Sequence, residues 1–161
     1  MGNQWLSLYL RDHHAASAGG VALARRTLGP HHTITRQIAR DRTTLEQVMR
    51  QLNVPTSASK VALVRMAERL GRLKLNGRLF TRSPLSRIVE LETLLVGIRG
   101  KEALWTALRV ADVSAHGVDL DALIESARTQ ADEVDERRLA EAAKTFVRRA
   151  ERTEFPASGV G

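Results

Sequence analysis

Residues Ser57–Arg87 read SASKVALVRMAERLGRLKLNGRLFTRSPLSR and form a basic segment in the middle of a 161-residue chain. The segment carries eight basic side chains and one acidic side chain, so its charge of +7 equals the formal net charge of the whole protein. Outside it, 17 of the 25 basic residues and 17 of the 18 acidic residues remain, and they balance. We therefore treat Ser57–Arg87 as an arginine-rich basic insert between two parts of the chain whose charges, +4 before it and −4 after it, cancel each other.

The composition of the chain is typical of a helical protein. Hydrophobic residues make up 43% of the sequence, aromatic residues only 4%, and there are four prolines. Alanine, leucine and arginine are the commonest residues, glutamate is also frequent, and all four favour helices. The length fits one domain, which we expect to span residues 1–152 and to be followed by a flexible tail at 153–161. The absence of cysteine excludes disulfides and thiolate chemistry.

Apolar residues recur every three or four positions, the period of a helix with one buried face. This pattern predicts four long helices and, within the basic insert, one short helix at Ser59–Leu73; the long helices are Trp5–Leu28, His31–Asn53, Leu85–Val110, and Leu120 to about Arg149. The connection at Gly29-Pro30 is short, so the helices on either side of it should be antiparallel neighbours. We expect an all-α fold, an antiparallel four-helix bundle of two helical hairpins with the short basic helix inserted between them.

A run of small residues, Ala15–Gly20, lies in the middle of the first predicted helix. Two glycines in a helix interior cost about 1 kcal/mol each relative to alanine. The run therefore suggests that another backbone comes close there, and Gly97 and Gly100 repeat the feature in the helix that follows the insert.

Each long helix also carries a polar group at or beside its apolar stripe: His13, Asp41 or Glu46, Glu92 or Glu102, and Gln130 or Glu133. Bundles that bind two metal ions supply one carboxylate from each of two helices and a Glu-x-x-His pair from each of the other two. The candidate ligands for a divalent metal or iron are His13, Glu46 and Glu92. The alternative is a buried hydrogen-bonded network, or a row of side chains at a solvated edge.

Residues 5–149 resemble the ferritin-like superfamily in a degenerate form. The resemblance rests on the order of the helices and on His13, Asp41, Glu46 and Glu92. The resemblance implies a paired-hairpin architecture and, in that superfamily, iron oxidation or oxygenation. The sequence departs from the superfamily pattern where Glu-x-x-His is expected, because it has Asp41-x-x-Thr44 and Gln130-x-x-Glu133. We therefore extend the resemblance to the architecture and not to the enzyme.

The basic insert is the candidate site for an anionic partner. Its cationic side chains form a ridge on the short helix and continue along the connection that follows, at Arg65, Arg69, Arg72, Lys74, Arg78 and Arg82. Such a ridge can bind phosphates or an anionic membrane surface, but its single aromatic residue, Phe80, gives base stacking little to work with. The fifth predicted helix is acidic, so we favour an acidic protein surface over nucleic acid, within one subunit or across a homodimer.

The sequence contains no apolar run near the about 20 residues that a membrane span needs, and its start does not read as a secretory signal. We expect a cytoplasmic, non-catalytic structural or interaction protein. The alternatives are a ferritin-like iron oxidoreductase and a nucleic-acid-binding protein that uses the basic insert.

Overall fold

The computed structural model describes residues 4–56 and 84–151. These residues form four helices and no strand, namely α1 (Gln4–Leu28), α2 (Thr33–Gln51), α4 (Pro84–Val110) and α5 (Leu120–Glu151). The predicted all-α class is confirmed. The predicted helix Ser59–Leu73, the anion-binding ridge and the C-terminal tail lie outside the described residues.

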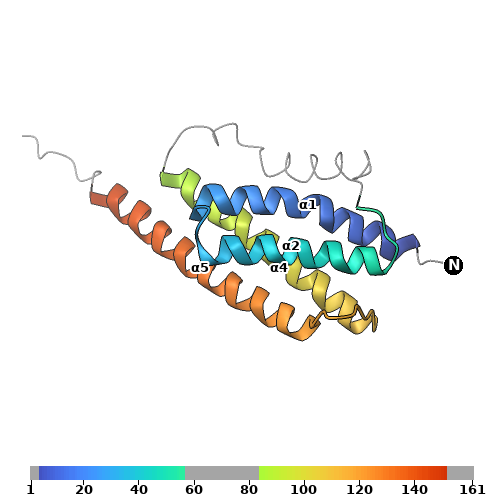
Figure 1. The fold of residues 1–161 in the computed structure, drawn as a ribbon. Helices are drawn as coiled ribbons and strands as arrows, with labels where there is room; N and C mark the ends of the chain where they lie inside the picture. Colours follow the sequence, from blue (N-terminus) through green and yellow to red (C-terminus); the bar gives the residue numbers. More distant parts are fainter. Residues whose placement is uncertain (1–3, 57–83, 152–161) are drawn as a thin grey trace, which may run out of the picture.

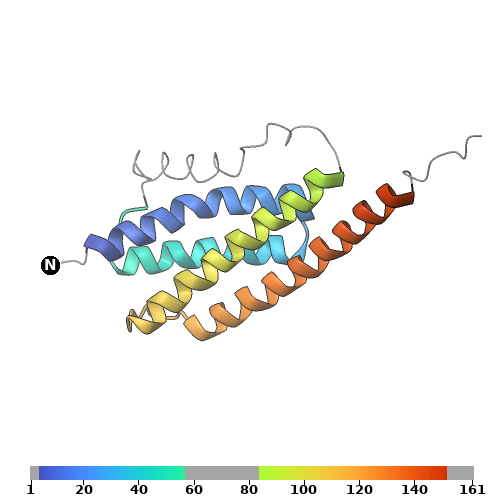
Figure 2. The same cartoon turned by 180° about the vertical axis from the view of Figure 1, so that it is seen from behind.

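The helices are arranged as two pairs. Figure 1 shows α1 and α2 side by side, with α2 returning along α1 after a short turn. The view from behind in Figure 2 shows α4 crossing α1 obliquely, with α5 returning beside α4. Within the described ranges, no helix carries an apolar stretch that would cross a bilayer.

Local signals in the sequence set the ends of these helices. Gly29 has a φ of +98°, which glycine adopts without steric cost, and it ends α1. The backbone N–H of Ile34 donates to Nδ1 of His32 at 3.2 Å, so His32 is the N-cap and α2 begins later than the sequence pattern predicted. Asp119 caps the start of α5, because its carboxylate accepts a hydrogen bond from the backbone N–H of Ala122 at 2.9 Å.

All four helices contribute to the buried core, which consists of two clusters. One cluster lies toward the start of α1 and the end of α4 and includes Leu10, Leu45, Met49, Trp105 and Ile124. The other includes Ala24, Ile38, Leu94, Ile98 and Val134. Burial of these apolar surfaces is the main stabilising contribution, at about 25 cal/mol per Å² removed from water.

The buried faces differ from the predicted stripes in two places. On α1, His14 and Ala15 are buried together with Leu10, Ala24 and Thr27, whereas His13, which the sequence placed at or beside the apolar stripe, is only partly buried. On α5 the apolar spacing of the sequence continues through Leu139 and Phe146, yet these side chains are 53% and 58% exposed. The physical reason on α5 is its length, because its C-terminal end projects past the other helices (Figures 1 and 2).

Candidate ligand-binding pocket

A pocket of about 110 Å³ lies between α1, α2 and α4, in the middle of the bundle. Its wall is mostly apolar and includes Leu23, Ile38, Leu45, Leu94, Ile98 and Trp105. Trp105 is 1% exposed, and its indole N–H is buried without a hydrogen-bond partner among the described residues. The pocket thus has a large aromatic side chain in its wall.

Glycines keep this space open. Gly20 of α1 and Gly97 of α4 both line the pocket, and a Cβ atom added at either position would meet no heavy atom of the described residues within 4 Å. The sequence suggested that the glycines admit a neighbouring backbone, but within the part of the chain that the structure describes no backbone comes close to Gly20 or Gly97. Their missing side chains leave open space beside the pocket instead of permitting close contact between the described helices.

A buried ion pair lies at the edge of the same pocket. Nζ of Lys101 on α4 donates hydrogen bonds to the carboxylate of Asp41 on α2 and, at 2.5 Å, to Oε1 of Gln130 on α5. Gln130 in turn donates to the hydroxyl of Ser126 at 3.0 Å. The side chains of Lys101 and Asp41 are 14% and 10% exposed, so one ammonium group connects three helices in a nearly dry environment.

Burial lowers the pKa of Lys101, and the negative charge of Asp41 partly offsets that effect. Removing an ammonium from water disfavours its charged form, while a hydrogen-bonded carboxylate favours it. Lys101 therefore depends on Asp41 to remain charged at this position. Lys101 in turn neutralises the negative charge of the nearly buried Asp41 carboxylate.

A second polar group joins α1 to α2 beside the pocket, where Ser17 and Arg42 line it. Nε2 of His14 donates to Oε1 of Glu46 at 3.0 Å, and Arg42 contacts the same oxygen at 3.3 Å. Arg42 also donates to the backbone carbonyl of His14 at 2.9 Å and to the hydroxyl of Ser17 at 2.5 Å. The hydrogen bond from His14 is the main cause of a lowered Glu46 pKa, and the charge of Arg42 adds to it.

The three metal-ligand candidates do not come together. His13 lines the pocket and meets Tyr9 edge to face at 4.6 Å between ring centroids, while Glu46 contacts His14 instead. Glu92 is about half exposed and lies 3.7 Å from Arg138. Among residues 4–56 and 84–151, no group of three or more histidine, aspartate or glutamate side chains could hold a metal ion. Because both carboxylates have cationic partners, His13, Glu46 and Glu92 do not fit a metal site.

Sequence reasoning named Asp41 and Gln130 only as options and did not single out Lys101. A signal was present, because Lys101 lies seven residues after Leu94 and four before Trp105 on an apolar helix face. A lone lysine on one apolar stripe and a lone aspartate on another are expected to pair when both are buried. The sequence grouped Glu46 with His13, whereas in the structure Glu46 contacts the next residue, His14. Adjacent residues on a helix point about 100° apart, so the rotation of α1 decides which histidine faces Glu46.

Comparisons with family models, with curated proteins and with solved structures gave no match to this chain. The ferritin-like resemblance therefore stays a prediction.

Proposed function

We propose that this protein is a non-catalytic binding protein that holds a small, neutral, mostly apolar molecule between α1, α2 and α4. The observation that carries the proposal is an apolar pocket of about 110 Å³ in the middle of the bundle, lined by two glycines that leave it open. Protein interiors are normally packed as densely as organic crystals. Apolar cavities of about 150 Å³ bind molecules as small as benzene, so a small ring or short chain suits this space.

The charges around the pocket favour a neutral ligand. Lys101 is paired with Asp41, and Arg42 with Glu46, so each charge at the edge of the pocket has a partner of opposite sign. A carboxylate or an amine entering the pocket would have to break one of these pairs, or stay desolvated without a partner. Toluene, or the alkyl chain of a short alcohol, has no strong hydration to lose on entry and gains contact with the aliphatic wall.

Trp105 provides a direct readout of binding. The chain has two tryptophans, and only Trp105 lines the pocket, whereas Trp5 is 71% exposed. In a Trp5→Phe background, titration with toluene or hexanol should change Trp105 emission saturably. Benzoate and benzylamine should have much weaker effects. Charged probes that bind as well as toluene would contradict the neutral-ligand assignment.

Two leucine substitutions on α4 form a matched pair for this test. Gly97→Leu places a side chain in the pocket and should abolish the saturable response, whereas Gly100→Leu adds the same group at a glycine that does not line the pocket and should retain it. Circular dichroism verifies that both variants remain helical. The proposal fails if toluene and hexanol give no saturable response, or if Gly97→Leu binds them as the parent protein does.

The iron oxidoreductase and nucleic-acid alternatives remain predictions. The described residues carry no observation that favours the first, and the second depends on the basic insert. Binding to duplex or single-stranded nucleic acid that weakens steeply with salt would support it.

A further inference from the structure

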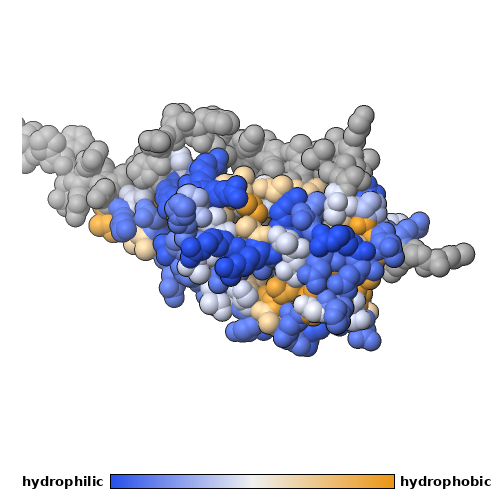
Figure 3. Space-filling view, viewed as in Figure 1, coloured by the Kyte–Doolittle hydropathy of each residue, from blue (hydrophilic) through white to orange (hydrophobic). Residues whose placement is uncertain are grey.

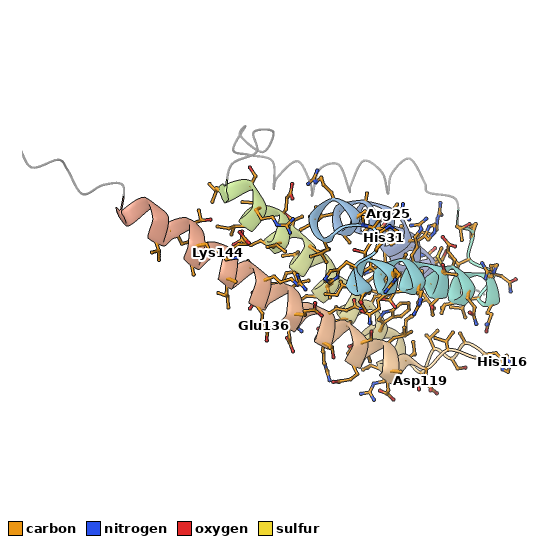
Figure 4. The ribbon with its side chains drawn as sticks, turned by 60° about the vertical axis from the view of Figure 1, so that its left-hand side comes forward. Arg25, His31, His116, Asp119, Glu136 and Lys144 are labelled. Carbon is orange, nitrogen blue, oxygen red and sulfur yellow. The ribbon has the colours of Figure 1, made fainter. Side chains whose placement is uncertain are left out.

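The C-terminal end of α5 extends past its packing partners. Figures 1 and 2 both show this end projecting beyond the other helices, and Figure 4 places Lys144 on the projecting part. The last inter-helix ion pair along α5 in the described residues joins Arg138 to Glu92 of α4 at 3.7 Å. Beyond it, among the residues that the structure describes, Lys144 pairs with Glu141 of the same helix, at 3.5 Å. A single helix of about a dozen residues is marginal in water without tertiary packing.

This projecting part carries an exposed apolar stripe. Leu139, Phe146 and Val147 are 53%, 58% and 59% exposed, and Ala143 between them is also exposed. An apolar patch is visible at the projecting end of α5 in Figure 3. The spacing from Leu139 to Ala143 to Phe146 is four and then three residues, which is the seam of a two-helix coiled coil.

A second copy of the same helix complements this stripe in shape. Large side chains at Leu139 and Phe146 alternate with the small side chain of Ala143. If two copies run antiparallel, Phe146 of one copy can pack over Ala143 of the other, and the two-fold axis repeats the contact. The small residue lets the helices approach closely enough for the aromatic ring to be buried.

The charge pattern along α5 favours the antiparallel direction. In the sequence, residues 132–141 contain five acidic and two basic side chains, whereas residues 142–151 contain three basic and one acidic. In the antiparallel register that places Phe146 over Ala143 of the partner, Glu141 of each copy lies opposite Arg148 of the other, so opposite charges meet on both sides of the apolar centre. Parallel copies would place like charges opposite each other, which is unfavourable.

We propose that the projecting ends of two α5 helices pack antiparallel around a two-fold axis near Ala143 and form a homodimer. The partner is a second copy of this chain, and the contact is apolar at its centre with opposite charges at its two ends.

Single-cysteine variants test the geometry directly, because the chain has no cysteine of its own. A disulfide needs two Cα atoms within about 4.4–6.8 Å, so Ala143→Cys, near the proposed axis, should give a disulfide-linked dimer under mild oxidation. Glu125→Cys is the matched control, since it places an exposed thiol on the same helix beside the bundle. Equal cross-linking at both positions, or none at Ala143→Cys, would overturn the proposal.

Light scattering of the full chain tests the apolar contact. The parent protein should be a dimer, and Leu139→Glu combined with Phe146→Glu should be a monomer of unchanged helicity. Val96→Glu and Val110→Glu change side chains that are 63% and 78% exposed elsewhere on the surface, and they should leave the dimer intact. High salt should not dissociate it, whereas salt should weaken a dimer held by pairing of the basic insert with an acidic helix. A monomeric parent protein, a dimeric double variant or dissociation by salt would contradict the proposal.

Discussion

The ammonium group of Lys101 on α4 donates a hydrogen bond to the carboxylate of Asp41 on α2, and both side chains are nearly buried. Gln130 of α5 accepts a second hydrogen bond from the same nitrogen. These two contacts fix the relative positions of three helices beside the pocket. Each charge of the pair is acceptable in the interior only while the other is present.

Removing one member of this pair should be strongly destabilising. Lys101→Met leaves the Asp41 carboxylate buried without its cation, and the expected loss is about 3–5 kcal/mol of unfolding free energy. Asp41→Leu should cost a similar amount, because it leaves Lys101 charged or forces it to lose its proton. Denaturant unfolding measures both losses.

The double variant Asp41→Leu/Lys101→Met distinguishes pairing from simple packing. It removes both buried charges and replaces them with apolar side chains of comparable length. Its loss should be smaller than the sum of the single losses, with a coupling energy of about 0.5–3 kcal/mol. Additive losses would mean that the two groups contribute independently.

Alanine at the pocket glycines should stabilise the protein. The methyl group of Gly20→Ala or Gly97→Ala would meet no atom of residues 4–56 or 84–151 within 4 Å, and both positions have helical backbone. Each change should therefore add about 0.5–1 kcal/mol by lowering the entropy of the unfolded chain. Gly117→Ala should have the opposite effect, a loss of about 1–2 kcal/mol, because that glycine has a φ of +73°. Thermal unfolding of the three variants compares them, and a lower melting temperature for Gly97→Ala would show that α4 needs glycine for another reason.

Stability should fall in acid partly through Glu46. Its pKa in the folded protein lies below the ordinary value of 4.5, mainly because of the hydrogen bond from His14. The unfolded chain therefore takes up the proton first, and the contribution of Glu46, complete above about pH 4.5, is lost as the pH falls through the folded pKa. Glu46→Gln should be less stable than the parent protein at neutral pH, and the difference should shrink below pH 4.5. Glu125→Gln, which changes an exposed side chain, is the control. A stability difference between Glu46→Gln and the parent protein that stays constant with pH would argue against this linkage.

The two tryptophans should differ sharply in their contribution to the free energy of unfolding. Trp105→Ala removes a side chain that is 1% exposed, and the expected loss is about 3–5 kcal/mol because a cavity replaces the ring. Trp5→Ala changes a side chain that is 71% exposed and should cost less than about 0.5 kcal/mol. Chemical denaturation followed by circular dichroism measures both, and comparable losses would contradict the packing described for the two rings.

The sequence by itself determined the helical class and most of the helix ends. Caps and turns are local, because they depend on hydrogen bonds and backbone angles within a few residues. The cap at Asp119 and the glycine turn at Gly29 could therefore be predicted without knowledge of the fold. The stripe of α2 was also predictable, because that helix packs along most of its length, and Ile34, Asp41 and Leu45 are all buried.

Only the tertiary structure decided which polar groups meet. The partners of Lys101 lie 60 residues before it and 29 residues after it, and no local rule links those distances. The rotation of α1 about its axis decides that His14, and not His13, contacts Glu46, because one residue turns a helical side chain by about 100°. The apolar stripe of α5 was visible in the sequence, but its burial up to Val134 and its exposure from Leu139 depend on where the neighbouring helices end.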